Sequence, residues 1–244
     1  MSNLELSFLT TLIASFSTLI GFIPVLFNIK NTKNIINASL SIAAGVMISV
    51  SLTSLLPESI ELLSIYNNPI NTILIVISFA ILGLFMIKFL NIFLEKIDNK
   101  LYKLGIINML ALMIHNIPEG ILTFATMTHD QKLGITIVFM IICHNIPEGI
   151  SISIPIYYST KSKFKAFIYT FISGISEFMG ALLTYLFLYK YINNYFIGIL
   201  LSLIIGIMIY IPIYELLPNT KNYNNKFLTI IFFIIGFVLM ILIK

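Results

Sequence analysis

Charged residues are scarce in this sequence. Only 10% of its 244 residues are Asp, Glu, Lys or Arg, whereas 59% are hydrophobic. Soluble globular proteins carry about 25% charged residues, and a water-soluble fold could not bury so large an apolar share of the chain. The composition therefore excludes an ordinary soluble domain and predicts a protein whose solvent is lipid.

Cysteine is nearly missing and arginine is wholly missing. Cys143 is the single cysteine, so an internal disulfide is excluded. All 14 basic residues are lysines, and most lie in short loops between apolar runs, so we expect no nucleic-acid partner despite the net charge of +4. The N-terminus also lacks a basic leader and an A-x-A-like site, so we expect no cleaved signal peptide.

Long apolar runs dominate what is present. A bilayer core of about 30 Å requires about 20 helical residues to cross it, and a helix satisfies every backbone polar group within one segment. We therefore predict an all-α, polytopic membrane helical bundle that forms one transmembrane domain over residues 1–244. Its eight predicted spans are residues 6–28, 36–56, 70–94, 104–127, 133–157, 164–189, 193–216 and 226–243.

The placement of lysine predicts how the spans are oriented. Cytoplasmic loops of membrane proteins are enriched in lysine and arginine. Ten lysines follow odd-numbered spans and three lie on the opposite side, so we expect both termini to face outside, in the plasma membrane or a bacterial inner membrane. The ten are Lys30, Lys33, Lys96, Lys100, Lys103, Lys161, Lys163, Lys165, Lys221 and Lys226, and the three are Lys132, Lys190 and Lys244.

Two internal repeats are present. The segment His115–Gly120 has the sequence HNIPEG, and the same six residues recur at His144–Gly149 in the next span. A weaker repeat, Leu-Leu-Pro, occurs near the ends of the second and seventh spans, at 55–57 and 216–218. The lysines make the second span run outward and the seventh inward, so spans 1–3 and 6–8 are expected to be inverted repeats around a central pair. This 3+2+3 plan with a midplane site recurs among transporters.

Ionisable side chains inside the predicted spans are candidates for function, because a membrane is an expensive place for them. In each HNIPEG motif the histidine and the glutamate are four residues apart, so both point from one helical face. Imidazole nitrogen with carboxylate oxygen suits Zn²⁺, Fe²⁺ and Mn²⁺, and the lack of thiolate argues against a tight Cu⁺ or structural zinc site. With the asparagine oxygens, the candidate residues are His115, Asn116, Glu119, His144, Asn145, Glu148, Glu177 and Glu215.

The depth of these groups leaves two arrangements open. The fourth and fifth spans are antiparallel around a short loop near residue 129, so His115 and His144 should lie level and deep in the membrane. In ideal helices Glu119 would lie about 6 Å outward of that level and Glu148 about 6 Å inward. Either the proline before each glutamate bends the carboxylates together, or the ligands form two adjacent sites along the path.

The paired motif in the fourth and fifth of eight spans resembles the ZIP (Zrt/Irt-like) metal transporters, in particular the bacterial ZupT-type zinc transporters. The likeness covers essentially the whole chain, and the segment Ile172–Gly180 is similar to the sixth span of that family, whose acid contributes to metal binding. The resemblance implies a binuclear centre bridged by Glu119 and Glu148. Its zinc-type site would use His115, Glu119, His144 and Glu148, and its iron-type site Asn116, Glu119, Asn145, Glu148 and Glu177.

We therefore expect a transporter that imports divalent cations into the cytoplasm, with Zn²⁺ as the first cargo and Fe²⁺, Mn²⁺ or Co²⁺ as others. Its partners would be these ions and the lipid bilayer, and a homodimer is compatible with the sequence. The alternative is an intramembrane two-metal metalloenzyme, since such sites on helix pairs also catalyse hydrolysis and oxygen chemistry. The absence of an HExxH motif argues against an enzyme, and no catalytic cofactor is expected.

Two further groups leave alternatives open. Glu215 lies near the end of a span, where a structural bond is as compatible with the sequence as a role in the ion pathway. His129 and Asp130 lie in an outside turn, where a plain solvated loop competes with ion capture.

Overall fold

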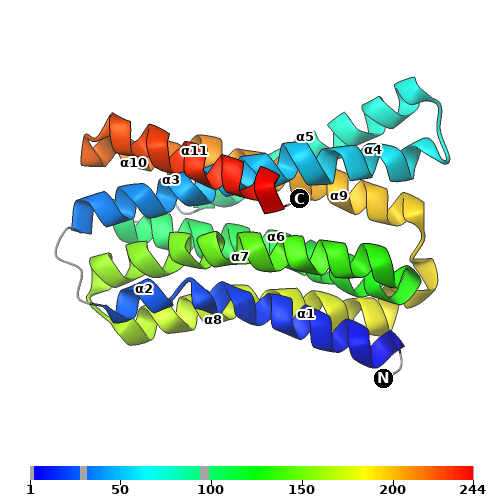
Figure 1. The fold of residues 1–244 in the computed structure, drawn as a ribbon, viewed down its shortest axis with the longest axis horizontal. Helices are drawn as coiled ribbons and strands as arrows, with labels where there is room; N and C mark the ends of the chain where they lie inside the picture. Colours follow the sequence, from blue (N-terminus) through cyan, green and yellow to red (C-terminus); the bar gives the residue numbers. More distant parts are fainter. Residues whose placement is uncertain (1–2, 28–31, 94–98, 244) are drawn as a thin grey trace.

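The computed structural model describes residues 3–27, 32–93 and 99–243. Throughout these ranges the chain is predominantly helical, and they contain no β-strand. Figure 1 shows the helices running side by side along the long axis of the molecule, so the chain forms an elongated bundle. The predicted all-α helical bundle is confirmed.

The helices vary in type along the chain. The α-helices are α1 (Asn3–Ile20), α2 (Ile23–Leu26), α3 (Thr32–Val50), α4 (Leu56–Ser64), α5 (Pro69–Phe93), α6 (Lys100–His129), α7 (Gln131–Thr160), α8 (Lys163–Leu183), α9 (Asn194–Tyr210), α10 (Leu217–Thr220) and α11 (Lys226–Ile243). Three π-helical turns are η1 (Ser51–Leu55), η2 (Thr184–Leu188) and η4 (Ile211–Leu216), and two 3₁₀ turns are η3 (Tyr189–Tyr191) and η5 (Lys221–Tyr223).

The outer surface of the bundle is apolar. Large apolar side chains point outward, and Ile70, Phe227 and Leu242 are 72%, 76% and 80% exposed. Among the described residues, seven helical segments are long and apolar enough to cross a membrane. The eighth predicted span falls on α11, whose apolar stretch Lys226–Leu242 is shorter. A surface of this kind is stable against lipid rather than water, so the chain is a multi-pass membrane protein.

Helices α6 and α7 form the centre of the bundle. They are antiparallel and meet at Asp130, whose Oδ1 accepts hydrogen bonds from the backbone N–H groups of Lys132 (2.9 Å) and Leu133 (3.2 Å) and so caps α7. Helices α1 and α8 pack on one side of this pair, and α3 and α9 on the other (Figure 1). Pro118 and Pro147 lie within α6 and α7 without ending either helix, so both HNIPEG motifs stay helical.

Helix packing supports the predicted inverted repeat. Helix α3 packs on α11, and α5 packs on α9. In the inverted repeat α3 corresponds to α9, and α5 corresponds to α11, so the two packed pairs are equivalent. Glycines allow the close approach in both pairs. The carbonyl of Phe233 on α11 leaves no room for a Cβ at Gly45 of α3, and the carbonyl of Ala80 on α5 does the same at Gly206 of α9. Gly45 and Gly206 stand at the same distance along the chain before their Leu-Leu-Pro segments.

Each Leu-Leu-Pro segment also ends a π-helical turn. The N–H of Leu56 donates to the carbonyl of Ser51, and the N–H of Leu217 donates to the carbonyl of Pro212, in both cases five residues back. A proline follows at once, and because it has no N–H, the carbonyl four residues before it loses its α-helical donor. The weak repeat in the sequence therefore corresponds to the same local structure in both halves.

Candidate metal centre

The two HNIPEG motifs face each other in the interior of the bundle. His115 and Glu119 come from α6, and His144 and Glu148 come from α7. None of these four residues is more than 2% exposed. In each motif the spacing of four residues is about one helical turn, which puts both side chains on the face that meets the other helix.

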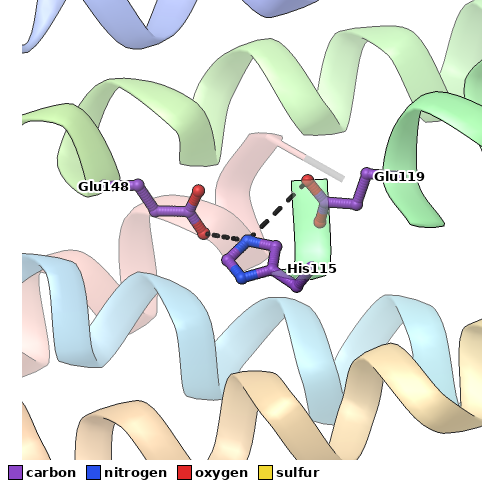
Figure 2. A group of neighbouring side chains, drawn as sticks. All are labelled: His115, Glu119 and Glu148. Atoms are coloured by element: carbon purple, nitrogen blue, oxygen red, sulfur yellow. Dashed lines mark ion pairs between the residues drawn. The ribbon is translucent and has the colours of Figure 1, made fainter. Parts of the chain in front are cut away.

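The side chains of the two motifs pair crosswise. Figure 2 shows His115 between the carboxylates of Glu119 and Glu148. The Nε2 atom of His115 lies 3.3 Å from Oε1 of Glu148, on the other helix, and 3.9 Å from Oε2 of Glu119, on its own helix. The Nε2 atom of His144 lies 3.1 Å from Oε1 of Glu119. Each histidine therefore contacts the glutamate of the opposite motif.

These distances suit ligands that share one ion. One donor atom from each of His115, Glu119 and Glu148 lies within 4.8 Å of the other two. Zinc binds nitrogen and oxygen at about 2.0–2.2 Å, so two ligand atoms on a tetrahedral zinc are about 3.3–3.6 Å apart. Small side-chain movements would reach that geometry. Of the two arrangements left open by helix geometry, the structure favours converging carboxylates.

The two asparagines turn their amide nitrogens away from this cluster. Nδ2 of Asn116 donates to the carbonyl of Ser173 (2.9 Å), and Nδ2 of Asn145 donates to the carbonyl of Ala14 (3.0 Å). A carbonyl can only accept, which fixes the orientation of each amide. Oδ1 of both asparagines has no hydrogen-bond partner within the described residues. In each asparagine the amide oxygen, which is the side-chain atom that can bind a metal ion, is therefore left available.

Glu177 of α8 joins the centre through Asn145. Its Oε2 accepts a hydrogen bond of 2.8 Å from Nδ2 of Asn145, and the residue is fully buried. Its Oε1 has no hydrogen-bond partner among the groups that the structure describes. The structure thus brings Glu177 together with Asn145, while Asn116 reaches only the backbone of α8.

The centre has too little positive charge for its carboxylates. No lysine in the described ranges forms an ion pair with Glu119, Glu148 or Glu177. Oε2 of Glu148 also has no hydrogen-bond partner there, and Oε1 has only the contact with Nε2 of His115 at 3.3 Å. Burial of carboxylate oxygens without donors is unfavourable. A divalent cation would supply the missing positive charge, so the donor set fits such an ion.

The remaining candidates lie away from the centre. Glu215 lines a cavity of about 240 Å³ together with Lys100 and Lys103. His129 is exposed and, with Asp130, lines a separate cavity of about 790 Å³. The structure therefore does not bring Glu215, His129 or Asp130 to the buried cluster.

Helix α1 contributes positions that the motifs did not indicate. The carbonyl of Ala14 receives the amide of Asn145, and Ser15 Oγ donates to the carbonyl of Gly174 on α8 at 2.8 Å. In the sequence, the one sign of this packing is the spacing of small and polar residues along one face of α1. These buried residues are Ser7, Thr11, Ala14, Ser15 and Thr18.

Comparison with known proteins identifies the family of the chain. The profile of the family described as ZIP Zinc transporter matches residues 98–244. A protein named Zinc transporter ZupT from Oceanobacillus iheyensis is 35% identical, with 98% of this chain and 97% of that protein aligned. Proteins of the same name are 36% identical in Clostridium perfringens (98% and 95% aligned) and in Chlorobium luteolum (99% and 98% aligned). The chain belongs to the ZIP zinc transporter family.

Proposed function

We propose that this protein transports Zn²⁺ across the membrane through the buried centre between α6 and α7. The crossed His115–Glu148 and His144–Glu119 pairs carry this proposal, because they hold nitrogen and oxygen donors at near-ligand spacing in the interior. Full-length similarity to proteins named zinc transporters supports the choice of ion.

The centre that we propose has two parts. His115, Glu119, His144 and Glu148 bind Zn²⁺, and Asn116, Asn145 and Glu177 add an oxygen-rich part that shares the two HNIPEG glutamates. Amide and carboxylate oxygens suit Fe²⁺, Mn²⁺ and Co²⁺ better than a thiolate site would. We therefore propose that these ions are accepted as further cargo. A mixed nitrogen and oxygen site of moderate strength also suits transport, since the ion must leave again.

We further propose that the whole chain is one transport unit that imports the ion into the cytoplasm, with both termini outside. The α7–α8 connection, with Lys161, Lys163 and Lys165, lies at the opposite end of the bundle from the α6–α7 turn (Figure 1). The lysine-rich end then faces the cytoplasm. In this proposal the metal is cargo and the protein is not an enzyme, in contrast to the metalloenzyme alternative.

Uptake of radiolabelled Zn²⁺ into proteoliposomes tests the function directly. We expect uptake above that of protein-free vesicles, and we expect it to be lost in the double variant His115→Ala/His144→Ala. The variant Cys143→Ala, one residue from the second motif, is the matched control and should transport normally. Vesicles that bind Zn²⁺ without accumulating it would contradict transport and favour the metalloenzyme alternative.

A further inference from the structure

Helices α1 and α8 are equivalent in the inverted repeat, just as α6 and α7 are. The amide of Asn116 on α6 bonds to the carbonyl of Ser173 on α8, and the amide of Asn145 on α7 bonds to the carbonyl of Ala14 on α1. The two contacts are equivalent, because the repeat relates α6 to α7 and α8 to α1. Ala14 on α1 therefore corresponds to Ser173 on α8.

A second pair of contacts fixes the same register one turn later. The carbonyl of Glu177 leaves no room for a Cβ at Gly120 of the first motif, and the carbonyl of Thr18 leaves none at Gly149 of the second. Thr18 follows Ala14 by four residues, and Glu177 follows Ser173 by four residues. Two independent contacts thus place Thr18 on α1 where Glu177 stands on α8.

The hydroxyl of Thr18, like that of Thr72, differs from those of the other buried threonines described. Thr11 and Thr170 each donate to a carbonyl four residues back in their own helix, at 2.8 Å. Thr18 is equally buried, yet its Oγ1 has no hydrogen-bond partner in the part of the chain that the structure describes. Its side chain lies at the interface of α1 and α8, where a Cβ on Gly174 would be 3.4 Å from Oγ1.

The oxygen of Asn116 is in the same situation. Asn116 corresponds to Asn145, whose amide binds the carboxylate of Glu177. On the other side of the repeat, Asn116 Oδ1 and Thr18 Oγ1 are both buried, and neither bonds to the other or to any other described group. Buried polar atoms without partners are rare in folded proteins and require an explanation, such as a bound ion or water. The repeat pairs Thr18 with Asn116 as it pairs Glu177 with Asn145, and this equivalence is the ground for assigning both atoms to one ligand.

We propose that Thr18 Oγ1 and Asn116 Oδ1 form a neutral oxygen subsite for the transported divalent cation, the α1-side counterpart of the Asn145–Glu177 pair. This inference rests on the proposed transport function. A hydroxyl and an amide oxygen are uncharged ligands of the kind that hard cations such as Mn²⁺ accept. The centre is then acidic toward α8 and neutral toward α1, and Thr18 is a residue that sets its ion preference.

Removal of one hydroxyl tests this subsite. Thr18→Val keeps the shape of the side chain and deletes the oxygen, and Thr11→Val is the control, since it deletes a buried hydroxyl of the same helix that bonds only within that helix. We expect Thr18→Val to weaken Mn²⁺ binding to the purified protein about tenfold and Zn²⁺ binding much less, because zinc also has both histidines. Thr11→Val and Thr18→Ser should bind both ions like the wild type.

A second test removes the carboxylate of Glu177 on α8 and adds one at the equivalent position, Thr18, on α1. Glu177→Gln should weaken Mn²⁺ binding, and adding Thr18→Glu to that variant should restore it, because the acid then stands at the equivalent position. If Thr18→Val elutes as an aggregate or loses its thermal transition, Thr18→Ala takes its place in the comparison.

The outcomes separate the two proposals. Wild-type Mn²⁺ affinity in folded Thr18→Val or Thr18→Ala, with no rescue by Thr18→Glu, would overturn the subsite while leaving zinc transport intact. Unimpaired Zn²⁺ uptake in His115→Ala/His144→Ala would instead overturn the proposed function on which the subsite rests.

Discussion

Oε1 of Glu119 lies 3.1 Å from Nε2 of His144, a residue of the other motif. Its Oε2 is 3.9 Å from Nε2 of His115 in its own motif. In the proposed centre, the crossing means that neither HNIPEG motif forms a complete site alone, because α6 and α7 each supply side chains to one cluster. Loss of one ligand should then disable the whole centre.

Substitution of a single ligand tests that conclusion. We expect Glu148→Ala or His144→Ala to reduce Zn²⁺ uptake by at least about a hundredfold, since even indirect partners of metal ligands change affinity by about 10–100-fold. Uptake is measured in proteoliposomes at matched protein levels, with Cys143→Ser as control. Near-normal uptake in both alanine variants would refute the assignment of the centre.

Glu177 should discriminate between ions. In the proposed centre it stands with Asn145 in the oxygen-rich part, and within the described residues it forms no ion pair with either histidine. We therefore expect Glu177→Gln to reduce Fe²⁺ transport more than Zn²⁺ transport, because iron depends more on oxygen ligands. Competition between the two ions in one uptake assay gives the ratio directly, and an equal loss of both would remove the case for two distinct parts.

Acid should weaken zinc binding. The two histidines must be neutral to bind metal, so protons compete with Zn²⁺. The unperturbed pKa of histidine is about 6.5. Below that value more of each imidazole is protonated, so apparent Zn²⁺ affinity should fall as the external pH falls from about 7.5 to about 5.5. Uptake titrations at each pH provide the measurement, and an affinity that stays constant over this range would exclude proton competition.

The orientation can be tested by labelling single cysteines. In a Cys143→Ser background, a cysteine at Ser162 should react only with a reagent on the cytoplasmic side, and a cysteine at Thr128 only with one outside. The two positions flank connections at opposite ends of the bundle (Figure 1). Reversed labelling would place both termini in the cytoplasm.

The equivalence of the two halves also predicts matched losses of stability. Gly45→Ala and Gly206→Ala each add a Cβ against the backbone of a neighbouring helix. We expect each to lower the free energy of unfolding by about 1–3 kcal/mol, as overpacking typically does. Thermal unfolding in detergent measures the effect, and a large loss in one variant beside none in the other would contradict equivalent packing.

The sequence was sufficient to predict the helical bundle and to single out the four HNIPEG side chains that the structure brings together. Apolar runs of about 20 residues form helices in lipid. The rise per residue along two antiparallel helices then places His115 and His144 at the same depth in the membrane. The crossed pairing was not predictable in this way. It depends on the direction of side chains across an antiparallel helix pair, which the spacing along each helix does not contain.

The role of α1 escaped prediction for a different reason. Ala14 acts through its backbone carbonyl, and every residue has one, so no residue type marks the position. Thr18 has a side chain that is common in membrane helices and normally bonds within its own helix. Only the comparison of α1 with α8 in three dimensions distinguishes Thr18 from the other buried threonines.

The π-helical turns η1 and η4 widen their helices at equivalent points of the two halves. A π turn holds one residue more than an α-helical turn, because its hydrogen bond reaches five residues instead of four. Both halves carry such a turn directly before Leu-Leu-Pro. In each half the extra residue is absorbed within one turn, so the helix continues past it rather than ending.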